Sequence, residues 1–238
     1  MAATRAGKEP LNLRLLHPWD VDYQEAVSIQ NTLKKELILH DGVKIAPVDV
    51  IAGADISYSR GSDLFFAAVV LLSYPDMQPI EEVHAVERVS FPYIPGLLSF
   101  REGPVLLKAF EKLQQQPDLV MFDGQGIAHP RGLGLAAHLG LFLDIPAIGC
   151  AKSRLCGEHR EPGPLPGDHE DLLYQGWVIG SVLRTKARVR PVFVSPGHRI
   201  SLERSREITL ECCRGYRLPE PVRQAHLAVN RLRLNVSF

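Results

Sequence analysis

Three carboxylates stand at positions where acidic side chains are uncommon or where sites are built. Asp55 lies within the apolar stretch AGADISYS, Asp123 ends the apolar stretch LVMFDGQG, and Glu102 lies in the segment expected to be the neighbouring helix. A carboxylate in a buried strand needs a partner or a cation, and open α/β sheets build their sites at strand ends. Either aspartate alone could simply cap a loop or a helix. Together, the three favour a hard cation such as Mg²⁺ or Mn²⁺, and phosphoryl chemistry at that cation.

A glycine-rich run follows Asp123. The stretch DGQGIAHPRGLGLAAHLG places Gly124, Gly126, Gly132 and Gly134 within eleven residues, more than a tight strand-to-helix connection needs. Glycine lets the backbone approach a ligand closely or adopt a positive φ. The spacing differs from that of a dinucleotide fingerprint. The run therefore predicts a loop that approaches a ligand.

Three basic or titratable side chains could act on a phosphate. Lys152 follows the apolar stretch PAIGCA and could neutralise a phosphate or a leaving-group charge. His129, beside Pro130, could orient a phosphate or a metal-bound water, and His226 lies on a partly apolar helical segment. Taken singly, a lysine such as Lys152 or a loop histidine such as His129 is more often a surface residue, and a helical histidine such as His226 is more often a core residue.

Two prolines stiffen an apolar projection upstream of Glu102. In VSFPYIPGLLSFREGP, Pro92 and Pro95 fix their own φ and hold the preceding residue extended. Tyr93 and Ile94 are therefore expected on a rigid projection and not in an ordinary turn.

Composition places the chain among soluble globular proteins. Its 238 residues are 45% hydrophobic and 23% charged. No stretch approaches the ~20 apolar residues of a membrane span, and the N-terminus lacks the apolar region of a secretory signal, so we expect a cytoplasmic protein without a membrane partner. The cysteines match no CxxC zinc pattern and are expected to be unbridged thiols; they are Cys150, Cys156, Cys212 and Cys213.

The net charge is zero, but its distribution is uneven. Residues 184–238 contain twelve Lys or Arg and four Glu, a balance of +8, so the preceding residues carry −8. A basic C-terminal portion suits a polyanionic partner. A solvated surface would explain the same charges.

The elements that must position these residues follow from the hydrophobic pattern. Apolar and alternating runs predict three successive strands, hence an antiparallel meander, and strands alternating with helices then predict parallel crossovers. The first helix should begin near Asp20 as its N-cap and end at Asp41-Gly42. The expected elements up to residue 151 are a helix over 20–41, strands over 49–59, 64–74 and 80–91, a helix over 97–116, a strand over 118–124, a helix over 132–143 and a strand over 146–151.

The rest of the chain begins with a Pro- and Gly-rich loop over 157–167. Strands are expected over 176–183 and 190–196, a helix from Ser201 to Gly215, and a last helix over 219–233. No stretch reads as a linker, so we expect a single α/β domain over 1–238, built on a mixed sheet flanked by helices.

Taken together, these stretches resemble the endonuclease V family. The order and rough spacing of the family's motifs are matched, over about residues 20–233, by GADISY, PYIPGLLSFREGP, DGQGIAHPRGLGLAAHLG, GCAKSRL and QAHLAVN. The resemblance implies an RNase H-like fold, which agrees with a meander followed by βαβ units. It also implies a Mg²⁺-dependent enzyme, with Mn²⁺ as a substitute, that nicks DNA near deaminated bases, chiefly deoxyinosine. The cut falls at the second phosphodiester bond 3′ to the lesion and leaves 3′-hydroxyl and 5′-phosphate ends.

The same resemblance implies roles for single residues. Asp55, Glu102 and Asp123 would bind metal, and His226 would lie near it. Lys152 and His129 would contact phosphate or metal-bound water, and all of these except His129 would be catalytic. The segment from Pro92 through Tyr93 and Ile94 to Pro95 would be a wedge that fills the gap left by the extruded base. The base pocket would be lined by Gly96, Leu98, Gly124, Gly126, Leu135, Ala151 and Leu155.

We therefore expect a DNA repair endonuclease that acts as a monomer on double- or single-stranded inosine-containing DNA. A ribonuclease for inosine-containing RNA is an alternative, since eukaryotic members of the family favour RNA. A lesion-binding module without chemistry is another, although three carboxylates would repel a phosphate backbone. A small-molecule metallohydrolase would leave the wedge and the basic C-terminal portion without a use. The loop over 157–167 is richer in proline than the resemblance leads us to expect, and the sequence assigns it no role.

Overall fold

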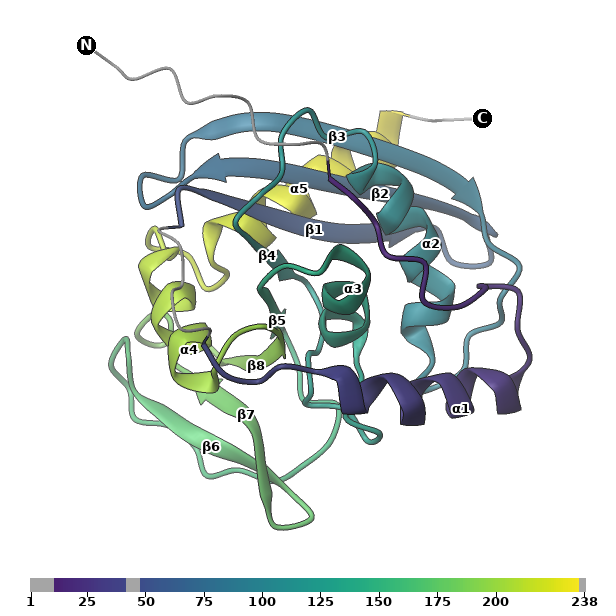
Figure 1. The fold of residues 1–238 in the computed structure, drawn as a ribbon. Coiled ribbons are helices and arrows are strands. Elements are labelled where there is room, and N and C mark those ends of the chain that lie inside the picture. The colour runs from purple at the N-terminus through teal and green to yellow at the C-terminus, as the bar shows by residue number, and fades with distance from the viewer. Residues whose placement is uncertain (1–10, 42–47, 236–238) are drawn as a thin grey trace.

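The computed structural model describes residues 11–41 and 48–235, and it contains one eight-stranded mixed sheet with helices on both faces (Figure 1). The strand order is β3-β2-β1-β4-β5-β8-β7-β6. The expected α/β class and mixed sheet are confirmed. This order brings strands from distant parts of the sequence side by side at the centre.

The first three strands form the expected antiparallel meander. They are β1 (Val50–Tyr58), β2 (Leu64–Ser73) and β3 (Pro79–Arg88). The uninterrupted apolar run of β2 is explained by helices on both sides of the sheet. Phe65 and Val69 join the core cluster that includes residues of α2 (Leu98–Phe110), whereas Phe66 and Val70 pack with residues of α5 (Glu220–Asn235).

Two parallel crossovers follow the meander. Strand β4 (Leu119–Phe122) pairs parallel with β1, and β5 (Ala147–Ala151) pairs parallel with β4. Helices α2 and α3 (Leu135–Leu143) lie in the two connections. Parallel strands end at the same edge of a sheet. That edge therefore carries the residues that follow β4 and β5.

Three antiparallel strands complete the sheet beyond β5. They are β8 (Val192–His198), β7 (Trp177–Leu183) and β6 (His169–Tyr174). Strand β6 was not predicted. It is the edge strand beside β7, with one further bridge from Leu173 to Glu158, and its sequence HEDLLY carries polar residues of the kind that protect such edges, so it lacks an apolar pattern.

The helices are shorter than expected at several ends. Helix α1 covers Tyr23–Leu33 and continues into the 3₁₀ turn η1 (Lys34–Glu36), so the predicted stretch over 20–41 was too long. Its cap is Asp22 and not Asp20, because Asp22 has Glu25 three residues later and forms a reciprocal capping box with it. Helices α2 and α3 are shorter too, whereas α5 extends slightly further.

Helix α4 (Leu202–Glu211) begins after Ser201 as expected, with the Ser201 side chain accepting from the Arg204 amide. Within the described ranges, no helix is long and apolar enough to cross a membrane. Cys150, Cys156, Cys212 and Cys213 are free thiols, as expected.

Candidate active site

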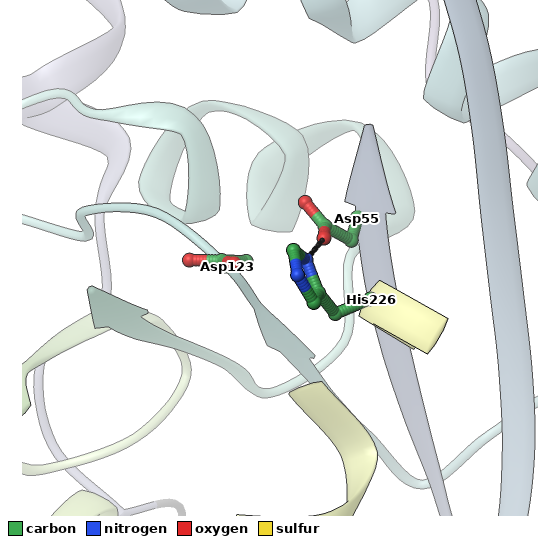
Figure 2. Close-up of side chains that lie close together, drawn as sticks. All are labelled: Asp55, Asp123 and His226. Atoms are coloured by element: carbon green, nitrogen blue, oxygen red, sulfur yellow. Dashed lines mark hydrogen bonds and ion pairs between the residues drawn. The ribbon is translucent and has the colours of Figure 1, made fainter. Parts of the chain in front are cut away.

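The pairing register of β1 with β4 brings Asp55 and Asp123 together. Ala54 of β1 pairs with Phe122 of β4, and the Asp123 amide donates to the Ala54 carbonyl oxygen over 3.1 Å. The next residues on the two strands are Asp55 and Asp123, so their side chains extend from neighbouring positions at the sheet edge (Figure 2). A carboxylate that looked misplaced in an apolar strand is thus explained by its place opposite a second one.

Helix α5 brings His226 to the same place, as Figure 2 shows. One possible ligand atom from each of Asp55, Asp123 and His226 lies within 4.8 Å of the other two. The Nδ1 atom of His226 is 2.8 Å from Asp55 Oδ2. Helix α5 is held against the sheet by the close contact of Gly53 with Pro221, where any Cβ on residue 53 would lie 1.9 Å from the Pro221 carbonyl oxygen.

Asn230 fixes the orientation of the His226 ring. Its Nδ2 lies 2.9 Å from the His226 carbonyl oxygen, so this atom is the amide donor, and it also lies 3.2 Å from His226 Nε2. The ring is thus held between Asp55, which faces Nδ1, and the Asn230 side chain, which faces Nε2. Ser57 Oγ donates to Asn230 Oδ1 over 3.1 Å and orients the amide. Asn230 closes the QAHLAVN motif, but a polar residue four positions along an amphipathic helix gives no sign of this role.

Lys152 supplies the positive charge nearest to the two aspartates. Its Nζ donates to Asp123 Oδ2 from the end of β5. Burial raises the pKa of Asp123, and the negative charge of Asp55 raises it further, while Lys152 opposes both effects. The carboxylates are therefore crowded beyond what one lysine compensates.

Glu102 adds to this crowding from α2. Its side chain is buried, and burial together with the charges of Asp55 and Asp123 raises its pKa to about 8. Its oxygens are not in the group of ligand atoms within 4.8 Å, and no residue in the described part of the chain donates a hydrogen bond to it. A buried carboxylate without a donor, facing two further carboxylates, is the arrangement that a cation relieves.

The donor set suits a divalent metal ion. Two carboxylates and an imidazole converge within bonding range of one point, with Glu102 nearby as a third carboxylate. Oxygen-rich sets of this kind favour Mg²⁺ or Mn²⁺. The residues present therefore fit a cation of that class.

The proline-clamped segment projects into solvent beside this cluster. Tyr93 is 64% exposed, and the guanidinium carbon of Arg101 lies 6.0 Å from its ring centroid. Pro92 and Pro95 are exposed as well, whereas Ile94 packs partly against the buried Phe100. Of the two side chains expected to form the wedge, Tyr93 therefore projects into solvent, whereas Ile94 is partly packed.

A small, mainly apolar cavity of about 110 Å³ opens beside Tyr93. It lies between the N-terminal end of α2, the loop that follows β4, and Leu155. Four of the seven residues expected in a base pocket line it: Gly96, Leu98, Leu135 and Leu155. The other lining residues are Tyr93, Ile94, Pro95, Ser99, Gln125, His129, Leu133 and Gly134.

The remaining three expected pocket residues lie outside this lining. Gly126 packs against β8, where a Cβ would lie 2.1 Å from the Pro196 carbonyl oxygen. Gly124 contacts Leu135, and Ala151 is buried with Ala128. At Gly126 the absence of a side chain therefore serves close packing of the loop on the sheet.

His129 is placed differently from the phosphate-contacting role expected for it. Its ring is buried, Nε2 lies 3.0 Å from the Gly96 carbonyl oxygen, and Nδ1 accepts from the Arg131 amide at 3.1 Å. Burial and the charge of Arg131 lower its pKa to about 4. The neutral ring thus has both nitrogens engaged by the backbone and holds the proline-clamped segment at Gly96.

The Gly96 carbonyl oxygen is the anchor of that segment. Besides His129, it accepts from Gln30 Nε2 at 3.0 Å and from Arg131 Nη2 at 2.5 Å. Gln30 also accepts from Arg131 Nε and donates to the Leu133 carbonyl oxygen. Gln30 is a buried residue of α1 that sequence reasoning missed, because a lone glutamine on a helix is ordinarily exposed.

Comparisons with known proteins identify the family of this chain. The family model for Endonuclease V matches residues 31–227. An endonuclease V of Methanothrix thermoacetophila is 52% identical over 94% of this chain and 98% of its own length. The crystal structure of endonuclease V from Bacillus subtilis superposes with a TM-score of 0.89 at 32% identity, covering 94% of this chain and 98% of that one.

A third relative was crystallised with nucleic acid. Ciona intestinalis endonuclease V, in complex with a 24mer DNA containing an inosine followed by a ribo-adenosine, superposes with a TM-score of 0.78 at 30% identity. The match covers 91% of this chain and all of that one. With the family model spanning most of the sequence and these relatives matched over nearly their whole length, the chain belongs to the endonuclease V family of nucleases.

Proposed function

We propose that this protein is a Mg²⁺-dependent DNA repair endonuclease that acts, as a monomer, on deaminated bases, chiefly deoxyinosine. It would hydrolyse the second phosphodiester bond 3′ to the lesion and leave 3′-hydroxyl and 5′-phosphate ends. The observation that carries the proposal is that a metal-type cluster and a small cavity share their supporting elements. Helix α2 supplies Leu98 to the cavity and Glu102 to the cluster, and the segment after β4 supplies Asp123 and Leu135. The inosine in the DNA bound by the Ciona relative supports the same substrate class.

Asp55, Asp123 and His226 would hold the metal ion, with Glu102 as a further carboxylate nearby. When bound, a divalent cation stabilises the developing charge on a phosphate and lowers the pKa of an attacking water. Mn²⁺ would serve in place of Mg²⁺, because it accepts the same oxygen-rich donors.

The chain's own residues would contribute orientation and charge. Asn230 would hold the His226 ring in place toward the metal site, and Lys152 places a positive charge where negative charge grows on the phosphate. Tyr93 would occupy the vacated stack, since a stiff wedge loses little entropy on insertion and offsets part of the unstacking cost.

Cleavage of inosine-containing RNA is a second candidate. The DNA in the Ciona complex carries a ribonucleotide directly after the inosine, so that relative accommodates a 2′-hydroxyl at this position. A protein that requires this hydroxyl would contact it with polar groups near the sugar.

The test uses matched oligonucleotides with one inosine, in DNA, in RNA, and in DNA with a single ribonucleotide after the inosine. Each is incubated with the protein and Mg²⁺, and the products are mapped at nucleotide resolution. We expect a single cut at the second bond 3′ to inosine in DNA, and none in the same sequence with adenosine. Cutting of RNA alone would establish the second candidate, and cutting at random positions would overturn both.

A further inference from the structure

The positive charge of the C-terminal portion is unevenly compensated. Six of its twelve Lys and Arg side chains pair with carboxylates: Arg184, Arg199, Arg204, Arg206, Arg223 and Arg231. Within the described residues, the side chains of Lys186, Arg188 and Arg190 have no hydrogen bond or ion pair. All three are exposed in the turn between β7 and β8. Three of the six basic side chains without a carboxylate partner among the described residues thus lie in one turn.

This turn borders a groove of about 600 Å³, here called the basic groove. Its cationic lining residues are Lys152, Arg154, Arg184, Arg188, Arg190 and Arg217, and its other lining residues are Ser153, His159, Glu161, Val189, Pro191 and Phe193. Arg154 is exposed and, like Arg188, has no side-chain partner among the described residues. The only carboxylate in the lining, Glu161, is 2.7 Å from Arg184. The groove therefore has the charge of an anion-binding surface.

The basic groove begins at the candidate active site. Ala151, the last residue of β5, pairs with Phe193 of β8, and Leu183, the last residue of β7, pairs with Val192. The end of β5, the start of β8 and the end of β7 therefore lie at the same sheet edge as the end of β4. Lys152 belongs to both places, since it lines the groove and donates to Asp123.

Two buried or half-buried arginines build the groove walls. Arg184 donates to the carbonyl oxygens of Gly163, Pro162 and Val189, which joins the Pro- and Gly-rich loop to the β7–β8 turn. Arg217 donates to the carbonyl oxygens of Lys152, Arg190 and Pro191.

The remaining contact is between rings. His159 packs edge-on against Phe193, with ring centroids 5.5 Å apart. The loop over 157–167, which the sequence left without a role, is thus a fixed wall of the basic groove.

We propose that the basic groove holds backbone phosphates of the strand being cut, on one side of the nucleotides at the metal cluster. This inference rests on the proposed function, and it names where the strand continues. The distance from β5 across β8 to β7 is two spacings between β-strands, or roughly 10 Å. At the rise of about 3.4 Å per nucleotide in one DNA strand, this distance accommodates about three nucleotides. Arg154, Arg188 and Arg190 would contact the phosphates, while Arg184 and Arg217 position the walls.

The test compares Arg188→Gln/Arg190→Gln with Lys34→Gln/Lys35→Gln. The control removes the same charge from η1, near His198 at the opposite edge of the sheet, where Ile38 donates to the His198 ring. Binding of single-stranded inosine oligonucleotides is measured in chelator at several salt concentrations. One oligonucleotide ends two nucleotides on either side of the inosine, and two others are extended by eight nucleotides on the 5′ or the 3′ side.

We expect one of the two extensions to increase the affinity of the wild type and of the control. In Arg188→Gln/Arg190→Gln, this gain in affinity should fall several-fold. The slope of log affinity against log salt concentration for the same oligonucleotide should be shallower by about 1.4, or 0.7 for each lost phosphate contact. Melting temperatures confirm folding, and the single variants Arg188→Gln and Arg190→Gln replace the double variant if it melts early. Equal slopes for variant and control, with inosine DNA still cut, would overturn the groove but not the proposed function. If the groove variant lost the gain in affinity but the wild type never cut inosine-containing DNA, the proposed function would be overturned and the basic groove would not.

Discussion

The side chains at the sheet edge are held in an electrostatically costly arrangement. Asp55, Asp123 and Glu102 face one another with Lys152 as the nearby cation, and Glu102 remains protonated to about pH 8 as a result. Function and stability are in conflict here, because the charges that would hold a metal ion destabilise the metal-free fold.

This conflict predicts the effect of Glu102→Gln on stability. In the folded state, the pKa of Glu102 is raised from 4.5 to about 8. The contribution of this side chain to the free energy of unfolding is therefore fully present below pH 4.5, and it is lost as the pH rises toward 8. In the presence of chelator, the free energy of unfolding of Glu102→Gln should therefore rise relative to that of the wild type. The difference should grow by on the order of 3 kcal/mol between pH 5 and pH 8.

Denaturant unfolding at the two pH values measures this difference. Glu111→Gln, at the exposed end of the same helix, is the matched control and should show no such pH trend. A pH profile of Glu102→Gln parallel to that of the wild type would show that Glu102 is not held protonated.

At the scale of elements, the proposed wedge, residues 92–95, is anchored by a helix far away in sequence. Gln30 of α1 and the His129–Arg131 segment converge on the Gly96 carbonyl oxygen, so the projection of Tyr93 is fixed from its C-terminal side. The prolines restrict the same segment locally. Stiffness of the wedge is thus shared between local and long-range causes.

Tyr93→Ala should weaken cutting of duplex more than cutting of single strands. Aromatic stacking on a base is worth about 1–3 kcal/mol, so nicking of inosine-containing duplex should slow roughly 10- to 100-fold. A single strand has no partner strand to hold apart and should lose less. Because the Tyr93 side chain is exposed, the melting temperature of Tyr93→Ala should equal that of the wild type. Equal losses on both substrates, together with earlier melting, would show that Tyr93 is a packing residue.

Gln30→Leu should produce a milder form of the same selective defect. It removes two donated hydrogen bonds and one accepted bond while keeping a side chain of similar size, so the wedge segment should loosen. The ratio of duplex to single-strand nicking should fall a few-fold, whereas exposed Asn31→Ala, on the next position of α1, should leave it unchanged. A Gln30→Leu ratio equal to that of the wild type would argue against anchoring through Gly96.

Some of these elements could be predicted from sequence and others could not. Asp55 and Asp123 could be found because a carboxylate in an apolar strand is anomalous, and β2 because both of its faces are apolar. Strand β6 escaped because only Leu172 of this edge strand is fully buried, so its sequence shows no alternating apolar pattern. Gln30 and Asn230 escaped because polar residues on amphipathic helices look the same whether they face solvent or a carbonyl group.

At the scale of the whole molecule, a continuous sheet connects the candidate active site, the cavity and the basic groove. Core clusters on both faces contact the same central strands β1, β2 and β4. We expect 1–238 to behave as one domain for this reason. Thermal unfolding followed by far-ultraviolet circular dichroism and by tryptophan fluorescence should then give coincident single transitions. Two separated transitions would indicate that the part containing β6, β7 and β8 unfolds independently.

In the function proposed here, Asp55, Asp123 and His226 form the metal site that cuts inosine-containing DNA. The most direct measurement is the nicking rate of Asp123→Asn on a single-inosine duplex at saturating Mg²⁺, with binding of the same duplex measured in parallel. We expect nicking to fall to background while binding is kept or strengthened, because the variant removes a proposed metal ligand and a negative charge facing the phosphate backbone. Nicking at the wild-type rate by Asp123→Asn would contradict the assignment of the site.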